Sequence, residues 1–505
     1  MTARRRALVD VVASVCVAAA IFAFFGHAFL NYDSMYALVW GEDIVEGRTP
    51  QYDAPVAPTP HPLATAVGAV VAPLGETSAE TVFIALVLLG FGALVVALFR
   101  LGSESYGVAV GVLAGLIFVT RVPPLNFGIR GYVDLPTVAF IAWAAVLEAR
   151  RPRRGAAVLV LLGLAGLLRP EAWLFAALYW LWLVLPLSAD RTADRLPAWL
   201  RSIGYGLAGV RAPRRDLRAR LGLALLAVAA PVLWLLSDLA VTGDLLWSLH
   251  GTSDLAAELG RPTGIERVPE LLPRRLGEIL RLPELLCAVA GTTAGLVWMR
   301  RRTIVPLAVA VLNGIAYVAF SIAGLSLLTR YLFLAAAMLS VLAAVAVFGW
   351  RSLPVEHPVR ERWRAAGLAA LALLVLFSWP QAQRLGDLRD DIAARDRVQA
   401  DLHDLVSADR AEALLDRCPG PVFVPNHRPV PSLAYWTGRR VTEIVSAEQV
   451  APSANGLFIA PRPEVASLSI LDPADESLPV DVVPSGYRVA GENRSWRLLA
   501  GPGCG

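Results

Sequence analysis

The sequence predicts a polytopic, all-α membrane bundle of about eleven transmembrane helices, followed by a small C-terminal α/β domain outside the cytoplasm. Hydrophobic residues make up 56% of the 505 residues and the mean hydropathy is +0.56. Charged residues make up only 17%, against about 25% in soluble domains. The apolar residues are clustered in nearly uncharged runs such as 81–99, 221–236 and 332–348. A span needs about 20 mostly apolar residues, so a soluble core does not explain so many runs.

Arginine placement predicts how the spans alternate across the membrane. The chain contains no lysine, and its arginines gather at Arg4–Arg6, Arg150–Arg154 and Arg300–Arg302, with eight more in 188–220. Cytoplasmic segments are enriched in basic residues, so these clusters are expected inside. The predicted helices are 8–30, 79–99, 106–120, 134–149, two flanking 169–171, 221–240, one ending at 300, two meeting near 330, and 365–379. The apolar run 11–30 is long for a cleaved signal peptide, which favours an uncleaved first helix with its N-terminus inside.

The composition changes near residue 380. We therefore expect a transmembrane domain over 1–379 and an extracytoplasmic α/β domain over 380–505. The second domain begins with a charged helical stretch, 383–417, and continues with short strand-like runs at 421–425 and 456–459. A hairpin is expected from 487–490 to 495–499. Cys418 and Cys504 both lie in this domain, where an oxidising compartment permits a disulfide; spacing alone does not decide whether they pair.

The first predicted outer segment, 31–78, holds the most informative residues. Asp33 lies where the first helix ends, and a carboxylate at the membrane surface is a natural general base. Residues 34–46 have helical apolar spacing, which indicates an amphipathic helix lying on the outer surface and ended by Gly47. Two interpretations of Asp33 stand at this point, because an aspartate before a short helix is also a good N-cap.

Further charges stand at the predicted outer ends of later helices. Asp134 opens the fourth helix and follows Arg130 by four residues, so it is either a helix cap with a local ion pair or a second acid facing Asp33. Arg169 and Arg330 are also expected there. The arginine fork suits phosphate oxygens, and the three arginines together are candidate ligands for an anionic lipid headgroup. Singly, each is equally explained by snorkelling to the interface.

Several familiar sites are missing from the sequence. It contains no Walker-type phosphate loop, no glycine-rich dinucleotide loop and no Cys/His cluster with metal-ligand spacing. No cytoplasmic nucleotide-binding domain is present, which argues against an ATP-driven pump acting alone. The positive charge is expected to report membrane topology, so nucleic acid is not an expected partner.

Taken together, the loop features resemble the GT-C superfamily of membrane glycosyltransferases, most closely the branch with protein O-mannosyltransferases and the aminoarabinose transferase of lipid A. The resemblance covers about residues 1–350. It rests on these segments: Tyr32-Asp33 with Tyr36, the 47–50 turn, Pro60-His61-Pro62-Leu63, Arg130 to Pro136, Arg169-Pro170-Glu171 and Arg330-Tyr331. The sequence departs from relatives in having His61 followed by a single proline, and in lacking lysine, a frequent phosphate ligand in relatives.

The resemblance implies an inverting transfer of a sugar from a polyprenyl-phosphate donor to an acceptor on the outer side of the cytoplasmic membrane. Asp33 matches the expected general base, and Asp134 the second acid of the site. Arg130, Arg169 and Arg330 are the candidates for binding the donor phosphate. The candidate substrate ligands are Tyr36, Glu42, Asp43, His61, Glu171 and Tyr331.

Donor sugar, acceptor and cofactor stay open at this stage. Mannose and arabinose are both compatible, as are a glycan, a glycolipid or a protein as acceptor. Some members of the superfamily use a divalent metal, for which Asp33, Glu42, Asp43 and Asp134 offer oxygen atoms. Two other functions compete with transfer: a transporter or flippase for lipid-linked glycans, and a non-catalytic protein of envelope assembly with the same fold. A transporter is expected to show polar residues at mid-membrane, whereas these gather at helix ends.

Overall fold

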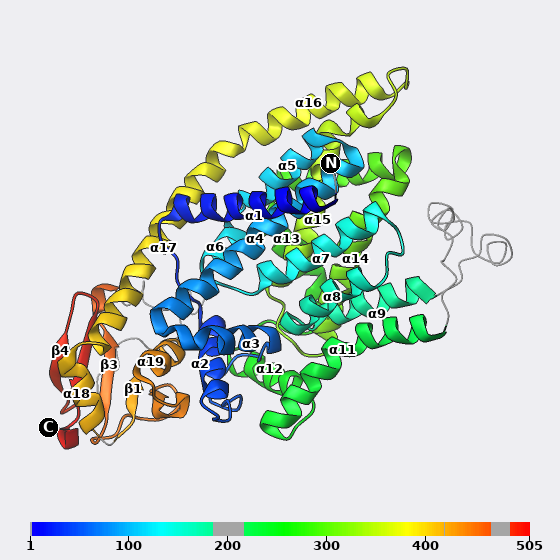
Figure 1. The fold of residues 1–505 in the computed structure, drawn as a ribbon. Coiled ribbons are helices and arrows are strands. Elements are labelled where there is room, and N and C mark those ends of the chain that lie inside the picture. Colours follow the sequence, from blue (N-terminus) through cyan, green and yellow to red (C-terminus); the bar gives the residue numbers. More distant parts are fainter. Residues whose placement is uncertain (1–2, 185–216, 419, 466–484, 505) are drawn as a thin grey trace.

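The computed structural model describes residues 3–184, 217–418, 420–465 and 485–504 (Figure 1). The predicted arginine-rich segment 188–220 lies outside these ranges except for its last four residues. The described chain forms a helical bundle, a group of short helices at one end of it, and a C-terminal domain with a small sheet, reached by the long path of α16 and α17.

Eleven helices of the described ranges form the bundle, and each overlaps one of the helices predicted from the sequence. Their bounds are α1 (Ala3–Phe25), α4 (Glu76–Tyr106), α5 (Val108–Val119), α7 (Asp134–Arg150), α8 (Ala156–Leu168), α9 (Glu171–Val184), α11 (Leu217–Thr242), α13 (Val268–Trp298), α14 (Arg300–Ile322), α15 (Phe333–Phe348) and α16 (Arg360–Leu376).

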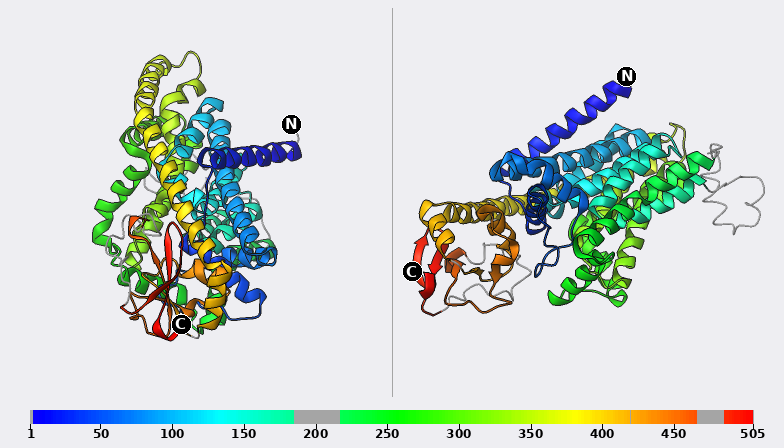
Figure 2. Two further views of the ribbon diagram at one scale, coloured as in Figure 1. Left: turned by 90° about the vertical axis from the view of Figure 1, so that its left-hand side faces the viewer. Right: turned by 60° about the horizontal axis from the view of Figure 1, so that its bottom comes forward.

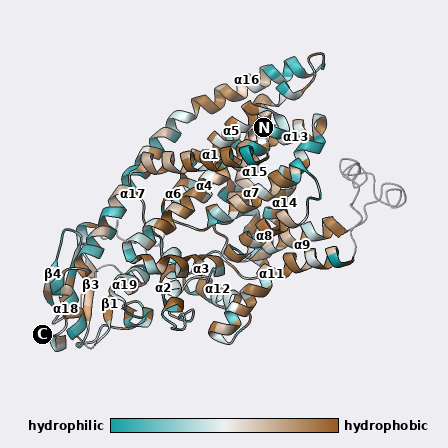
Figure 3. Cartoon of the chain, viewed as in Figure 1, coloured by the Kyte–Doolittle hydropathy of each residue, from teal (hydrophilic) through white to brown (hydrophobic). Residues whose placement is uncertain are grey.

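The described residues contain seven helices that are long and apolar enough to span a membrane, or eight if one bent pair counts as a span. Three shorter apolar helices accompany them. The chain is therefore a multi-pass membrane protein, while the predicted number of eleven spans stays a prediction. Figure 3 shows the apolar residues concentrated along these helices, with polar residues gathering toward the sheet and toward the loop before α16.

Helix α15 is the centre of the bundle. It is buried along almost its whole length and packs against α13, α5, α14 and α16. Seven of its sixteen residues are alanine or serine, and such small side chains let backbones approach closely in a membrane bundle. At Gly291 of α13 an added methyl group would collide with the carbonyl oxygen of Leu342 in α15. The close approach of these two helices explains the glycine.

Four short helices lie at one end of the bundle: α2 (Tyr32–Val45), α3 (Pro62–Val71), α6 (Val122–Ile129) and α12 (Trp247–Glu258). We call this the Asp33 end. Helices α2 and α3 cross closely at Gly41 and Gly68, where a side chain on either would meet the other helix's backbone. Gly47, with φ +72°, follows the end of α2, in agreement with the predicted stop.

The described residues of the C-terminal domain form three α-helices and five strands. The helices are α17 (Ser378–Val406), α18 (Asp409–Arg417) and α19 (Val430–Thr437). The strands are β1 (Val422–Val424), β2 (Ile444–Ser446), β3 (Leu457–Pro461), β4 (Arg488–Glu492) and β5 (Trp496–Ala500), in the order β2-β1-β3-β5-β4. β1 pairs in parallel with β2 and β3, while β4 and β5 form the predicted antiparallel hairpin. A disulfide joins Cys418 to Cys504, whose Cα atoms are 5.1 Å apart.

Three sequence interpretations need correction. The predicted loop 121–132 is mostly the helix α6, bent by 67° from α5, because Pro123 and Pro124 suit the first turn of a helix. The 60–63 segment opens the separate helix α3 instead of leading directly into α4. The helix predicted at 34–46 is present, but α3 and α19 cover it, so it does not lie exposed on a membrane surface.

Views from two further directions show how the parts are arranged (Figure 2). Helix α1 projects away from the rest of the bundle, and the sheet lies beyond the Asp33 end. Side-chain contacts join the sheet domain to that end. Arg440 binds Asp43 of α2 at 3.0 Å, and the Trp436 indole donates to Glu80 of α4 at 2.6 Å. The C-terminal domain thus packs directly over the helices that carry the candidate site.

Candidate functional site

The first turn of α2 positions Asp33. Asn31, not Asp33, caps the helix: its side-chain oxygen accepts hydrogen bonds from the backbone N–H groups of Asp33 at 2.8 Å and Ser34 at 3.2 Å. The Asn31 amide also donates to the carbonyl oxygen of Arg130 at 2.8 Å, which ties α2 to the end of α6. The cap leaves the Asp33 carboxylate free to point away from the helix terminus, so the capping interpretation of Asp33 is wrong.

Asp33 forms an ion pair with Arg330, whose Nη1 lies 2.9 Å from Oδ2. The two side chains are 20% and 15% exposed. Burial of the carboxyl group opposes its ionisation, but the positive charge of Arg330, helped by His61 and Arg261, outweighs burial and holds the pKa of Asp33 below its ordinary value. Asp33 is therefore a carboxylate at neutral pH.

A second, more deeply buried pair lies beside the first. Asp134, the first residue of α7, binds Nη1 of Arg169 at 2.9 Å, and Nε of Arg169 binds Glu171 at 2.7 Å. The guanidinium of Arg169 also stacks on the ring of Tyr331 at 4.5 Å. The predicted local pair between Asp134 and Arg130 does not form. Arg130 instead stacks on Phe29 and Tyr132.

A cavity of about 360 Å³ lies against both ion pairs. One part of its wall is apolar and comes from α9, α11, α12 and α14, with Trp173, Trp234 and Phe320 as its largest side chains. The other part is charged, with four arginines and two aspartates. The excess of arginine favours an anionic ligand, and the apolar wall favours one that carries a hydrocarbon or sugar face.

The charged wall contains residues that sequence reasoning missed. Its arginines are Arg169, Arg261, Arg330 and Arg428. Arg261 precedes the turn into α13, and its side chain forms no hydrogen bond or ion pair within the described part of the chain. No motif marks Arg261, because a single arginine in a long loop has no distinguishing pattern. Arg130, predicted to belong to this group, does not line the cavity and contacts a smaller one next to α17.

His61 also lines this cavity, as the residue before α3. Its ring lies edge-on to Trp234, with the ring centroids 6.0 Å apart. Burial, together with the charge of Arg169, lowers the pKa of His61 to about 4. The imidazole is consequently neutral at pH 7 and able to hydrogen-bond a sugar hydroxyl without adding charge.

The C-terminal domain contributes one side of the cavity through His427 and Arg428, which precede α19. Glu448 accepts hydrogen bonds from the His427 backbone N–H at 2.9 Å and contacts Nδ1 of the ring at 3.0 Å. The His427 ring packs edge-on to Tyr32, 5.4 Å between centroids. Burial of Glu448 is offset by its hydrogen bond to His427, so the pKa of Glu448 falls below the ordinary value. Residues far apart in sequence thereby build one site.

The other predicted substrate ligands divide between the cavity and its surroundings. Tyr331 lines the cavity, and Glu171 lies behind it in the Arg169 cluster. The Tyr36 ring is buried between Tyr32 and Trp40. Asp43 binds Arg48 and Arg440, and Glu42 lies beside it at the far end of α2. Tyr36, Glu42 and Asp43 do not line this cavity.

Within the described residues, no group of three or more histidine, cysteine, aspartate or glutamate side chains is placed to hold a metal ion. Asp33 and Asp134 each bind an arginine. Asp43 and Glu42 lie near the opposite terminus of α2 from Asp33. The four acids named as possible oxygen ligands therefore do not form one cluster.

Comparison with known proteins identifies the fold. No protein-family model and no curated protein matches the sequence. Among solved structures, ArnT from Cupriavidus metallidurans bound to undecaprenyl phosphate is similar at a TM-score of 0.55 and 13% identity, covering 99% of this chain and 100% of that one. The archaeal oligosaccharyltransferase AglB from Archaeoglobus fulgidus, in complex with an inhibitory peptide and a dolichol-phosphate, gives a TM-score of 0.47 and 14% identity over 86% of this chain and 63% of that one. The protein has the GT-C fold, as the resemblance predicted.

Proposed function

We propose that the protein is an inverting glycosyltransferase that moves a sugar from a polyprenyl-phosphate donor to an envelope acceptor outside the cytoplasmic membrane. One observation carries the proposal: an ionised aspartate and four arginines line a single cavity that also has an apolar wall, at the end of a membrane bundle. A transferase of this class needs a base for the acceptor hydroxyl and cations for the departing phosphate, and both are within this cavity.

The donor binds with its phosphate toward the arginines and its lipid toward the apolar wall. Arg261 is the strongest candidate for the first phosphate contact, because its guanidinium forms no direct ion pair with a carboxylate among the described residues. Arg330 is the second: it has further donors beside the Nη1 that binds Asp33. Arg169, held by Asp134 and Glu171, contributes charge and fixes the ring of Tyr331.

Asp33 acts as the general base. The acceptor oxygen attacks the anomeric carbon and gives its proton to Asp33, while the bond from that carbon to the phosphate oxygen breaks. Polyprenyl phosphate leaves with the electron pair, and the configuration at carbon inverts. When the donor phosphate shares the charge of Arg330, the ion pair with Asp33 weakens and the carboxylate becomes a stronger base. Donor binding thus prepares the base for the acceptor.

The acceptor approaches from the C-terminal domain, whose His427 and Arg428 line the cavity. In this arrangement the Asp33 end faces outward, in keeping with the arginine-based topology. The neutral His61 and the positioned His427 offer hydrogen bonds to sugar hydroxyls. Mannose and arabinose are the candidate sugars, and the candidate acceptors are a glycan, a glycolipid or a protein.

The direct test measures sugar transfer in isolated membranes supplied with labelled polyprenyl-phosphate mannose, and in parallel with the arabinose donor. We expect wild-type membranes to form a new glycosidic product, and Asp33→Asn to reduce the rate by about 10²- to 10⁴-fold, the usual contribution of a general base. Asp53→Asn is the matched control, because Asp53 is an exposed acid in the same segment outside this cavity. Equal transfer by wild type and Asp33→Asn would remove Asp33 from the chemistry.

A further inference from the structure

A second and larger cavity lies at the other end of the bundle. Along α7, Glu148 in its wall is about 20 Å from Asp134, since a helix rises 1.5 Å per residue. Its volume is about 850 Å³. The ends of α4 and α9, the second half of α7, the first half of α14 and the 3-10 turn Gly349–Ser352 surround it. Alanines on the facing helices, among them Ala145 and Ala308, leave this space between them.

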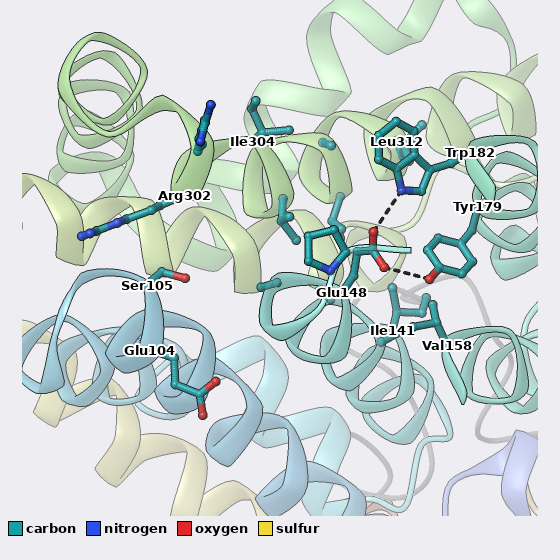
Figure 4. A pocket seen from close by; sticks show the side chains of 18 of the residues that line it. Glu104, Ser105, Ile141, Glu148, Val158, Tyr179, Trp182, Arg302, Ile304 and Leu312 are labelled. Carbon is teal, nitrogen blue, oxygen red and sulfur yellow. Dashed lines mark hydrogen bonds between the residues drawn. The ribbon is translucent and has the colours of Figure 1, made fainter. Parts of the chain in front are cut away.

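The cavity wall is polar at two places and apolar between them (Figure 4). Arg302 and Ser105 lie at one side, and Glu148 with Tyr179 and Trp182 at the other. Ile304 lies between these two places in this view, whereas Leu312 lies beside Trp182, and Ile141 and Val158 lie beside Tyr179. Arg301 and Arg351 add two cations to the lining. An occupant must therefore combine an anionic group with hydrocarbon.

The acids of the lining do not neutralise these arginines. Glu148 accepts hydrogen bonds from the Tyr179 hydroxyl at 2.7 Å and the Trp182 indole at 2.9 Å, and its carboxylate is turned toward them in Figure 4. Glu104 binds Arg150 through both oxygens, at 2.7 and 2.6 Å. Within the described ranges Arg301 and Arg302 form no ion pair, so the cavity has an uncompensated positive side.

We propose that this cavity binds one anionic glycerophospholipid of the phosphatidylglycerol type, with its phosphate on Arg301 and Arg302 and its acyl chains along α7 and α14. Basic pockets between transmembrane helices are suited to anionic lipid headgroups. The apolar wall excludes a free phosphate ion as the occupant, because an ion cannot cover it. A zwitterionic phospholipid is disfavoured because its ammonium group adds positive charge beside the arginines.

The site is separate from the proposed transfer reaction, since it lies at the opposite end of the same helices. A bound lipid fills the gap that the alanines leave between α7 and α14, and joins the two helices through apolar contacts. α14 runs from this cavity to Ala319 and Phe320 at the Asp33 end. The lipid is thus expected to stabilise the bundle that carries the catalytic cavity.

Native mass spectrometry of the full-length protein in detergent tests the proposal by titration with phosphatidylglycerol, phosphatidylethanolamine, undecaprenyl phosphate or inorganic phosphate. We expect one phosphatidylglycerol to be retained at least tenfold more tightly than phosphatidylethanolamine. Removing both arginines in Arg301→Gln/Arg302→Gln is expected to weaken retention about 25-fold, since each arginine near an anionic lipid contributes about a factor of five. Arg362→Gln/Arg364→Gln, on exposed positions of α16, is the charge-matched control.

Ala308→Trp supplies an independent variant, because it fills the cavity without changing its charge. We expect it to abolish phosphatidylglycerol retention while far-ultraviolet circular dichroism stays that of the wild type. Four results would overturn the proposal: equal retention of phosphatidylglycerol by the arginine variant and wild type, equal retention of both phospholipids, binding of inorganic phosphate alone, or preferential retention of undecaprenyl phosphate that Ala308→Trp removes.

Discussion

We expect the ion pair between Asp33 and Arg330 to set the pH below which sugar transfer is lost. With 2.9 Å between the nearest atoms, the two charges attract by about 6 kcal/mol at an effective dielectric constant of 20. Desolvation of both groups offsets part of this attraction, and burial by itself acts to raise the pKa of Asp33. In wild type the charge of Arg330 outweighs burial, so the pKa of Asp33 lies below its ordinary value and Asp33 stays ionised to a lower pH than a free carboxyl group.

Arg330→Gln removes the largest influence that favours ionisation and leaves burial to act. The pKa of Asp33 then rises above its wild-type value, so protonation of the base and loss of transfer begin at a higher pH. We expect the acid limb of kcat/KM to move toward neutral pH. Losing one partner of a largely buried pair is also expected to lower the free energy of unfolding by about 3 kcal/mol.

The assay is the pH profile of kcat/KM in purified protein, measured alongside thermal unfolding. Arg330→Lys is the matched control: it keeps the charge but loses the planar fork, so its rate falls while its acid limb stays near that of wild type. The height of the profile is not the decisive readout, because Arg330 is also proposed to contact the donor phosphate. An acid limb at the same pH in Arg330→Gln and wild type would refute the reasoning.

Three further predictions concern other parts of the chain. Burial lowers the pKa of His61 to about 4, so kcat/KM of wild type should not change with the titration of this residue from about pH 5.5 to 7.5. An inflection near pH 6.5 that disappears in His61→Asn would contradict this expectation. Gly291→Ala should disturb the contact of α13 with α15 and lower the free energy of unfolding by about 1–3 kcal/mol. Gly314→Ala is the control: an added methyl group there meets nothing within 4 Å, so this variant should be neutral or slightly stabilising. Cys418→Ser removes the disulfide to Cys504 and should lower the free energy of unfolding of the C-terminal domain by about 2–5 kcal/mol. Equal denaturation midpoints of the wild type with and without reductant would show that the disulfide does not contribute.

Local chemistry made much of the fold predictable. Runs of apolar residues indicated the approximate position of each bundle helix, because the need to satisfy the backbone inside a membrane leaves helices as the accessible solution for such sequences. The start of α13 was not located, since this helix begins at Val268, before its apolar run. Turn residues around 491–495 located the β4–β5 hairpin. Two of the missed elements are short: β2 has three residues, and α6 is an eight-residue helix inside a segment that resembles a loop. Short elements owe their form to tertiary packing.

Residue partners within the candidate site were less predictable. The sequence singled out Asp33, Asp134, Arg169 and Arg330 because each stands at a helix end, and the structure brings all four to one place. It suggested Arg130 as the partner of Asp134, since the two are neighbours in sequence. The pairing with Arg169 arises because α7 and α8 are antiparallel neighbours, which places the start of one beside the end of the other.

By itself, the sequence determined that the chain crosses a membrane repeatedly, that its charged residues gather at helix ends, and that a small domain follows the bundle. These features depend on local composition, which hydrophobicity and periodicity report directly. Tertiary structure alone decided that Asn31 caps α2 and frees Asp33, that Arg261 and His427 reach the same cavity, and that a lipid-sized space opens between α7 and α14. Each depends on contacts between segments far apart in the chain, and a single sequence contains no signal for such distances.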